Sequence, residues 1–411
     1  MITVLVSVAV FFIVMIILVA MLLYARKKLV PQGKVTLTVN ADKQFEVEMG
    51  NSVLSTLVEN KIFLPSACGG KGTCGMCRCR VPQGGGDILA NEKGFFTSRE
   101  VAANWRLGCQ TKIKNDISVI IPESVFGVKK WECEVVSNRN VATFIKEFVL
   151  QLPEGENLGA RAGGYIQVDV QPCTIDYKDM LIEDEFRSDW DKFRMWDLKM
   201  KNSELVYRAY SMANYPAEGN RIMLNVRIAT PPFDRKRGGF MKVNPGVCSS
   251  YIFSRKSGDK VTVSGPYGEF FVEDTGREMV FIGGGAGMAP LRSQIFDEFK
   301  TKQTKRKASY WYGGRSLKEL FYIEDFRELE KEFPNFKFNI ALSEPLAADN
   351  WTGYTGFIHQ VLYDNYLKDH PAPDEIEYYM CGPGAMANAV LNMLDDLGVP
   401  REMIRFDDFG N

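Results

Sequence analysis

Four cysteines in the sequence have a spacing that suits an iron–sulfur cluster. Cys68, Cys74 and Cys77 lie close together and Cys109 follows later, which gives the pattern C-x5-C-x2-C-x31-C. A 2Fe–2S cluster is bound by four thiolates, and one known spacing is C-x4-C-x2-C with a distant fourth cysteine. We therefore predict that these four cysteines bind a 2Fe–2S cluster, with a first gap one residue longer than in that pattern.

The loop between these cysteines is rich in glycine. A backbone without Cβ atoms can wrap closely around a cluster and direct its N–H groups at the sulfur atoms. These glycines are Gly69, Gly70, Gly72 and Gly75. Cys79 lies two residues beyond Cys77 and would point to the same side of an extended strand, so it is a competing ligand. The C-x2-C pair with Cys74 favours Cys77.

Zinc and disulfide bonds are the alternatives for these cysteines. Zinc ribbons usually have two C-x2-C pairs, whereas this chain has one pair and its histidines, His359 and His370, are far away. Disulfide frameworks are typical of small secreted domains, and this chain has 411 residues with an odd number of cysteines, 9. Both alternatives fit less well than a cluster.

Two further segments could hold a ring-bearing phosphate ligand. In the sequence RAYS at 208–211, strand alternation puts the arginine and the tyrosine on one face, where a cation and a ring can meet one ligand. The sequence GVCS at 246–249 can present backbone N–H groups to phosphate at the start of a helix. The alternative for the segment RAYS is an ordinary strand with a surface arginine and a packed tyrosine that bind no ligand.

A glycine loop forms the third candidate site. The apolar run 279–282 is typical of a buried parallel strand, and the sequence GGGAGMAP at 283–290 leads from it into a helix. Such a loop binds a dinucleotide pyrophosphate. The pattern is G-x-G-x-x-P rather than G-x-G-x-x-G, and no acidic residue ends the next strand, 308–312. A last strand, 376–380, runs into Cys381, where ligands bind in parallel sheets; a buried small thiol is the alternative.

Composition narrows the function further. A chain of 411 residues suggests about two to four domains. The formal charge of −1 gives no support for nucleic-acid binding. With 2 histidines in the chain, catalysis by a histidine base and histidine-rich metal centres are disfavoured.

The N-terminal segment predicts a membrane anchor. Residues 2–25 contain no charged side chain, and as a helix they would span about 36 Å, enough for a hydrocarbon core of roughly 30 Å. A cleaved signal peptide would have a positive start and an A-x-A-like site, which are missing here. The basic residues Arg26, Lys27, Lys28 and Lys34 follow directly. We expect a single-pass anchor with the large soluble part in the cytoplasm.

The remaining elements must position these sites. Alternating strands at 34–39 and 45–49 predict a hairpin, Ser52 begins a short helix, and strands at 78–81 and 117–121 flank the cysteine loop. From residue 131 onward, short alternating strands predict a β-barrel. The charged segment 171–205 interrupts it. That segment contains Trp190, Phe193 and Trp196, and exposed tryptophans are typical of docking surfaces; a solvated loop is the alternative.

The hairpin, helix, cysteine loop and late cysteine at about 33–125 resemble the β-grasp ferredoxins. The segments RAYS, GVCS and GPYGEF (265–270), followed by the G-x-G-x-x-P loop and C-G-P at 381–383, resemble the ferredoxin–NADP reductase superfamily. That resemblance implies that Arg208 holds FAD phosphate, Tyr210 stacks on the isoalloxazine and Ser211 approaches its N5. It also implies that Cys381 lies against the nicotinamide, and that a C-terminal aromatic, Phe409 rather than Phe406, covers the flavin.

Over its whole length the chain resembles the F subunits of bacterial sodium-translocating NADH:quinone reductases, which combine an anchor, a ferredoxin domain, an FAD domain and an NAD domain in this order. The resemblance implies hydride transfer from NADH to FAD, then single electrons to the 2Fe–2S cluster and on to partner subunits and quinone, at the bacterial inner membrane. The implied partners are the other membrane subunits, membrane lipid and NADH, with no nucleic acid. NADH is expected over NADPH because Arg315 is the one obvious cation after the second strand.

Two other functions remain open at this point. Reductase components of bacterial oxygenases share the order of the three soluble domains but lack the anchor and the segment 171–205. A non-catalytic, membrane-tethered redox sensor would need the cluster alone, and the flavin and nicotinamide motifs argue against it.

The predicted fold is multidomain: an N-terminal transmembrane helix, a β-grasp ferredoxin domain, an antiparallel β-barrel and an α/β domain with a parallel sheet. The predicted domains are the anchor and its basic flank (1–30), the 2Fe–2S domain (31–128), the FAD barrel with its insertion 171–205 (129–273) and the NAD domain (274–411). The predicted catalytic residues are Tyr210, Ser211 and Cys381. The predicted cofactor-binding residues are Arg208, Tyr210, Ser211, Gly246, Val247, Cys248, Ser249, Gly285, Ala286, Gly287, Pro290, Cys381, Gly382, Pro383 and Phe409. The predicted metal ligands are Cys68, Cys74, Cys77 and Cys109.

Overall fold

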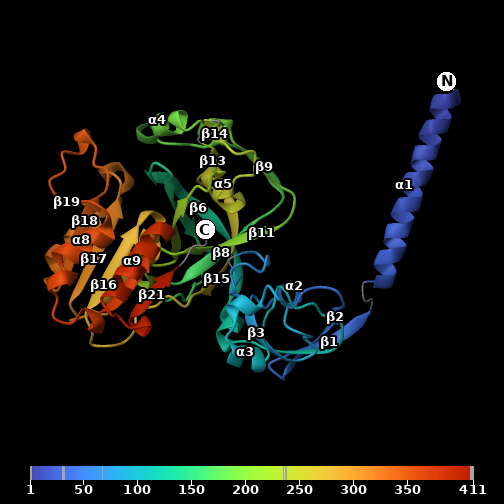
Figure 1. Cartoon of the computed structure of the whole chain (residues 1–411), viewed down its shortest axis with the longest axis horizontal. Coiled ribbons are helices and arrows are strands. Elements are labelled where there is room, and N and C mark those ends of the chain that lie inside the picture. The colour runs from blue at the N-terminus through green and yellow to red at the C-terminus, as the bar shows by residue number, and fades with distance from the viewer. Residues whose placement is uncertain (1, 30–32, 67, 235, 237, 408–411) are drawn as a thin grey trace. The chain divides into compact units, whose positions relative to one another are not determined.

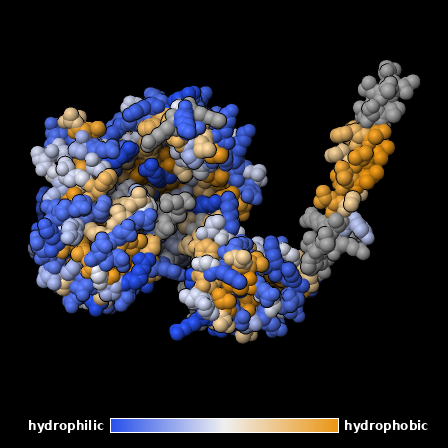
Figure 2. Space-filling view, viewed as in Figure 1, coloured by the Kyte–Doolittle hydropathy of each residue, from blue (hydrophilic) through white to orange (hydrophobic). Residues whose placement is uncertain are grey.

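The computed structural model describes residues 2–29, 33–66, 68–234, 236 and 238–407, which form two compact units, 1–127 and 128–411 (Figure 1). In helix α1 (Ile2–Leu29) the described side chains are those of residues 10–22 and 24, and all are exposed. Figure 2 shows this stretch as a hydrophobic surface. Counted over the described residues alone, no helix has the length and apolar character that a membrane crossing needs.

The first unit contains a five-stranded mixed sheet with the strand order β2-β1-β5-β3-β4. Strand β1 (Lys34–Val39) pairs antiparallel with β2 (Lys43–Glu48) and parallel with β5 (Ile117–Ile120). Helix α2 (Val53–Glu59) begins at Ser52, whose hydroxyl accepts the N–H of Ser55. The other elements are β3 (Arg78–Gln83), η1 (Lys93–Phe95), α3 (Ser98–Ala102), β4 (Trp105–Leu107) and η2 (Glu123–Gly127).

Alternation along these strands builds the core of this unit. Leu37 and Val39 of β1 are fully buried, and Val53 and Leu57 of α2 join the same apolar cluster. The predicted hairpin, helix and flanking strands are thus present. This core packs α2 against the sheet.

The second unit begins with a six-stranded antiparallel sheet in the order β11-β8-β15-β6-β7-β12. A bridge between Met212, the residue after β11, and Leu224 in the middle of β12 connects the two edge strands, so the sheet closes into the predicted barrel. Its strands are β6 (Lys129–Ala142), β7 (Ile145–Gln151), β8 (Tyr165–Val170), β11 (Val206–Ser211), β12 (Arg221–Arg227) and β15 (Lys260–Tyr267). Helix α5 (Val247–Ser254) and the short strands β13 (Phe233–Asp234) and β14 (Gly239–Phe240) complete this part.

The insertion 171–205 folds onto the barrel. Its strands β9 (Cys173–Asp176) and β10 (Lys199–Asn202) form a hairpin around η3 (Tyr177–Asp179), α4 (Asp184–Lys192) and η4 (Met195–Asp197). Trp190 has no exposed surface and packs against the rings of Tyr177 and Phe253. The expectation that the tryptophans form an exposed docking surface is therefore wrong for Trp190, because α4 is amphipathic and turns its apolar face to the barrel.

The last part of the chain is a parallel sheet in the order β19-β18-β17-β16-β20-β21, with helices packed against it (Figure 1). Its strands are β16 (Met279–Gly284), β17 (Ala308–Gly314), β18 (Phe336–Leu342), β19 (Tyr354–Thr355), β20 (Glu377–Cys381) and β21 (Ile404–Asp407). Its main helices are α6 (Met288–Phe296), α7 (Ile323–Glu332), α8 (Ile358–Asn365) and α9 (Gly384–Asp396), with the short turns η6 (Gly285–Gly287), η7 (Asp297–Thr301) and η8 (Leu317–Glu319). Sequence neighbours β16 and β17 pair directly, whereas β20 lies on the other side of β16, so the strand order reverses at β16.

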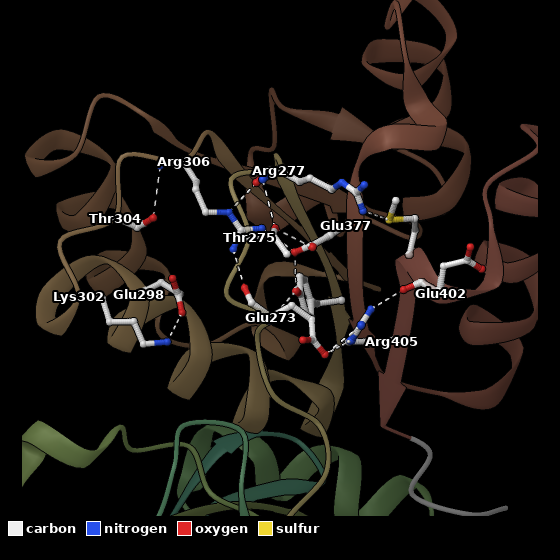
Figure 3. Close-up of polar contacts among 12 residues, drawn as sticks. Glu273, Thr275, Arg277, Glu298, Lys302, Thr304, Arg306, Glu377, Glu402 and Arg405 are labelled. Atoms are coloured by element: carbon white, nitrogen blue, oxygen red, sulfur yellow. Dashed lines mark hydrogen bonds and ion pairs between the residues drawn. The ribbon is translucent and has the colours of Figure 1, made fainter.

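A polar network braces the amino ends of these strands (Figure 3). Arg306, just before β17, forms a buried ion pair with Glu377 of β20 at 2.5 Å and donates to the backbone carbonyl oxygen of Glu273. Arg405 of β21 pairs with the Glu273 carboxylate at 2.9 Å. The link between barrel and sheet is therefore fastened at the amino edge, and ligands in parallel sheets bind at the opposite, carboxyl edge.

Candidate functional site

The four predicted cluster ligands lie in two pairs. The sulfurs of Cys68 and Cys74 are 3.3 Å apart, and Cys77 and Cys109 share a hydrogen bond. The hydrogen bond from Cys74 holds the pKa of Cys68 well below its usual range, and the one from Cys77 lowers the pKa of Cys109. The same two hydrogen bonds raise the pKa of the donors, Cys74 and Cys77. Within the described residues, no three or more Cys, His, Asp or Glu side chains converge on one metal position.

Backbone donors surround these sulfurs. Cys68 accepts hydrogen bonds from the backbone of Thr73, and Cys109 accepts one from the backbone of Gly72. Gly72 has φ +77°, and a Cβ there would lie 2.5 Å from the amide nitrogen of Gln110. That amide donates to the Cys109 sulfur at 3.4 Å. The four cysteine sulfurs and the donors around them therefore fit a 2Fe–2S cluster, whose sulfurs need such hydrogen bonds.

The competing thiol, Cys79, lies in the core of the first unit. It is fully buried on β3, and its sulfur points at the carbonyl oxygen of Arg106, at 3.8 Å. Burial raises the pKa of Cys79 to about 12, so it stays a neutral thiol. The buried ion pair of Arg106 and Glu92, at 2.7 Å, lies next to it. This environment is unlike that of the two thiol pairs.

The predicted flavin residues meet around one cavity of about 580 Å³. Arg208, Ala209, Tyr210 and Ser211 all line it from β11. Burial raises the pKa of Tyr210 well above its ordinary value. The segment 246–249 lines the cavity at the start of α5, and a Cβ on Gly246 would lie 2.6 Å from the Ala229 side chain. A cation, a ring and a helix start at one cavity fit a flavin with its pyrophosphate.

Sequence reasoning missed Asp407, which lies beside these residues. The hydroxyl of Ser211 donates to the Asp407 carboxylate at 2.7 Å. Strand β21 pairs Asp407 with Cys381 at the carboxyl end of β20. Nothing in the sequence links positions 211 and 407, because the contact depends on how the last strand joins the sheet.

A second cavity, of about 510 Å³, lies at the carboxyl ends of the parallel strands, and of the residues predicted to bind the dinucleotide Gly285 and Pro383 line it. Gly284, Gly285, Gly313 and Gly314 line it, and so do Ala385 and Met386 at the start of α9. A Cβ on Gly287 would lie 2.0 Å from the Cys381 carbonyl oxygen, so α6 can start close to β20 only with glycine at this position. A glycine loop and the start of α9 both present N–H groups to a pyrophosphate.

Two charged residues of this cavity were also missed. Glu319, on η8 beyond β17, lines the cavity together with Arg315, so the carboxylate sought at the end of the strand lies a few residues farther along. A carboxylate there opposes the binding of a 2′-phosphate, which Arg315 alone would favour. Arg227, at the end of β12, lines both cavities. The sequence around Arg227 did not indicate a binding role, since an arginine at the end of a strand usually faces the solvent.

Some predicted site residues lie elsewhere. The Cys381 side chain is 2% exposed and belongs to the apolar core of the sheet; it lines neither of the two cavities. Gly382 and Pro383 do line the flavin cavity, and so do Ala286 and Gly287, whereas Pro290 is buried in the first turn of α6. Phe409 lies outside the described residues. Phe406 is described, and Arg401 stacks over its ring.

The two cavities adjoin each other. Arg227, Gly284, Gly285 and Pro383 line both of them. A flavin ring in the first cavity and a dinucleotide in the second would therefore meet across the glycine loop.

Three family models match the chain. An oxidoreductase NAD-binding domain matches residues 281–392, a 2Fe-2S iron-sulfur cluster binding domain matches residues 37–114, and an oxidoreductase FAD-binding domain matches residues 191–272. The three matches follow the order of the cysteine loop, the barrel and the parallel sheet. The chain thus contains domains for a 2Fe–2S cluster, FAD and NAD.

Relatives resemble nearly the whole chain. The F subunit of the Na(+)-translocating NADH-quinone reductase of Pseudomonas aeruginosa is 55% identical over 96% of this chain and 95% of the relative. The protein of the same name from Neisseria meningitidis is 54% identical, with 98% of each chain covered.

Among solved structures, the Amycolatopsis cytochrome P450 reductase GcoB covers 91% of this chain and 98% of its own, at 22% identity and a TM-score of 0.63. The ferredoxin reductase in carbazole 1,9a-dioxygenase covers 92% of this chain and 99% of its own, at 23% identity and a TM-score of 0.59. These two structures share the fold.

Proposed function

The chain belongs to the family of the F subunits of Na(+)-translocating NADH-quinone reductases, and from this premise we propose that it is the subunit through which electrons from NADH enter such a complex. The observation that carries the proposal is the shared wall of the two cavities, formed by Arg227, Gly284, Gly285 and Pro383. Bound FAD supplies the conversion of a two-electron hydride into single electrons, which a 2Fe–2S cluster can carry.

On the flavin side, the residues of β11 hold and orient the ring. The Arg208 guanidinium would bind the FAD phosphate, and the Tyr210 ring would stack on the flavin. The Ser211 hydroxyl donates to Asp407 at 2.7 Å, and this bond would fix its direction toward the reacting part of the ring. The segment Gly246–Ser249 offers the N–H groups of the start of α5 to the pyrophosphate.

On the nicotinamide side, the glycine loop and the start of α9 bind the dinucleotide. Gly285 would bring its backbone N–H group to the phosphates. Ala286, Gly287 and Gly382 line the flavin cavity, and with Pro383, which lines both cavities, they would lie where the nicotinamide meets the flavin. Cys381 would support the glycine loop through its backbone, because its carbonyl oxygen lies against Gly287. A direct catalytic role of its thiol has no support from its buried position.

In the first unit, Cys68 and Cys74 would ligate one iron and Cys77 and Cys109 the other. The short distance within the first pair and the hydrogen bond within the second support this assignment. The thiolates accept backbone N–H groups, which stabilise the negative charge that a cluster gains on reduction.

Helix α1 would anchor the chain in the bacterial inner membrane beside the other subunits, with the soluble part on the cytoplasmic side. The uncharged sequence 2–25 and the basic residues that follow it support this placement. The chain's contacts would then be membrane lipid, the other subunits and, through them, quinone. A chain that begins at Gly33 should keep NADH–ferricyanide activity and lose quinone reduction in membranes, since tethering raises the effective concentration of a weak contact.

Anaerobic titration of the full-length protein with NADH tests the proposal. The flavin absorbance should bleach and the rhombic EPR signal of a reduced 2Fe–2S cluster should appear, with NADPH much less effective. An oxygenase reductase would pass these tests too. Purification of the detergent-extracted protein separates the two functions, because only a protein that belongs to the complex brings several multi-span membrane proteins with it. Full loading with FAD and cluster but no reduction by NADH would refute the proposal.

A further inference from the structure

One wall of the dinucleotide cavity is a turn of the barrel. Phe144 lies between β6 and β7 and lines the cavity together with Ile145. Glu319 lines the same cavity from the parallel-sheet part. The position of this turn therefore decides the width of the cavity on that side.

The insertion 171–205 holds this turn. The indole nitrogen of Trp190 donates to the backbone carbonyl oxygen of Thr143 at 2.8 Å, in fully buried surroundings. The Phe144 ring packs between two rings of the insertion, with centroid distances of 6.5 Å to Trp190 and 5.7 Å to Phe193. Phe144 thus packs against the insertion and also lines the cavity, so the insertion supports this part of the cavity wall.

Thr143 and helix α4 also contact η8, the turn that carries Glu319. The Thr143 hydroxyl donates to the Glu319 carboxylate, and the neighbouring Lys318 forms an ion pair with Asp189 of α4 at 2.7 Å. Thr143 therefore joins two walls of the cavity, and α4 binds both the turn and η8.

We propose that the insertion 171–205 positions the NADH-binding wall, and that Trp190 is a positioning residue that sets the affinity for NADH through Thr143, Phe144 and Glu319. The inference rests on the proposed oxidation of NADH. It gives the charged insertion a role inside the protein, in place of the docking role that its tryptophans suggested. Because none of these residues lines the flavin cavity, the effect should fall on dinucleotide binding and leave the flavin bound.

The substitution Trp190→Phe tests this in the full-length protein. It keeps an aromatic ring in the core and removes the indole N–H group that donates a hydrogen bond to the Thr143 carbonyl oxygen. Loss of one neutral hydrogen bond predicts a KM for NADH roughly two- to tenfold higher, with kcat within about twofold and an unchanged FAD content. Steady-state NADH–ferricyanide kinetics measure both constants, and flavin release on denaturation measures the FAD content.

Trp196→Phe is the matched control. This indole also lies in the insertion, but its N–H group donates to Asp191 within the same segment, at 2.7 Å. Its KM should equal that of the wild type. An equal rise of KM in both variants would mean that general loosening of the insertion is responsible, and would overturn the proposal.

Thr143→Val provides a second test outside the aromatic core. Valine keeps the shape of threonine and removes the hydroxyl that Glu319 accepts, so KM should again rise while kcat stays. If the wild type oxidises NADH and neither Trp190→Phe nor Thr143→Val changes KM, the positioning role is wrong while the proposed function stands. If the wild type itself fails to oxidise NADH, the proposed function fails first.

Discussion

The cluster loop and the dinucleotide cavity are built in opposite ways. Three of the four cluster ligands lie between positions 68 and 77, and several of their hydrogen-bond donors come from the same loop. The cavity takes its wall from Phe144, Arg227, Glu319 and the start of α9, which lie far apart in the chain. Loop geometry alone almost completes the first site, whereas the second exists only when four segments pack together.

Because of this difference, single substitutions should affect the two sites differently. A cluster loop depends on thiolates and on glycines with positive φ, such as Gly72, so single substitutions there should act in an all-or-none way. A cavity assembled from distant walls should respond gradually, since each wall contributes a part of the binding free energy. The following substitutions, two sets in the first unit and two in the second, test this contrast, and those with the strongest predicted effects come first.

The cluster should be lost when Cys77 is replaced by serine and retained when Cys79 is replaced. Cys77 pairs with Cys109, while Cys79 is a neutral buried thiol directed at a backbone carbonyl. EPR of the dithionite-reduced protein and iron analysis measure the cluster in both variants. A signal that survives in Cys77→Ser and disappears in Cys79→Ser would exchange the two assignments.

FAD should bind roughly ten- to a hundredfold more weakly to Arg208→Ala, because a charge-assisted hydrogen bond to phosphate contributes about 1.5–3 kcal/mol. Fluorescence titration of the apoprotein with FAD measures the change. Arg221→Ala is the matched control: it removes an exposed arginine of β12 that does not line the flavin cavity. Equal weakening in both variants would show that Arg208 has no specific role.

Lys146 should make stability depend on pH. Its amino group is buried and donates to the carbonyl oxygen of Leu181 in the insertion, and burial lowers the pKa of Lys146 to about 8. Below pH 8 the amino group of Lys146 is protonated in both the folded and the unfolded state. Above it the unfolded state binds one proton more, up to its own pKa near 10.5, so the folded state gains stability as the pH rises.

Between pH 8 and 9.5 the wild type should gain roughly 1–2 kcal/mol relative to Lys146→Met. Chemical unfolding of both proteins, followed by the fluorescence of the second unit, gives the difference. A difference that stays constant over this pH range would mean that the lysine is charged when folded.

The smallest effect is expected at Gln110. Its amide donates to the Cys109 sulfur at 3.4 Å and is itself oriented by Asn91 at 2.9 Å. Such donors favour the reduced cluster, so Gln110→Leu should lower the reduction potential by roughly 20–60 mV, the equivalent of one hydrogen bond. EPR-monitored redox titration measures it, and Gln83→Leu, on an exposed part of β3, is the control. An unchanged potential in Gln110→Leu would show that this contact does not tune the cluster.

The sequence alone determined the parts that depend on local chemistry. Alternating apolar residues predicted the strand 34–39, an apolar run predicted the strand 279–282, and a serine with a helix-forming run predicted the start of α2. The spacing of thiols and the glycine loop indicated which cofactors the chain binds, because ligand types and backbone freedom are properties of short segments.

Only the tertiary structure decided how distant segments complete the sites. Ser211 meets Asp407 because β21 joins β20 at the edge of the sheet. Trp190 is buried and supports Phe144 because α4 folds back on the barrel. The thiol of Cys381 turned into the core, although its position at the end of a strand suggested a ligand contact. Periodicity tells which face of an element is apolar, but which partner covers that face depends on packing between segments far apart in the chain.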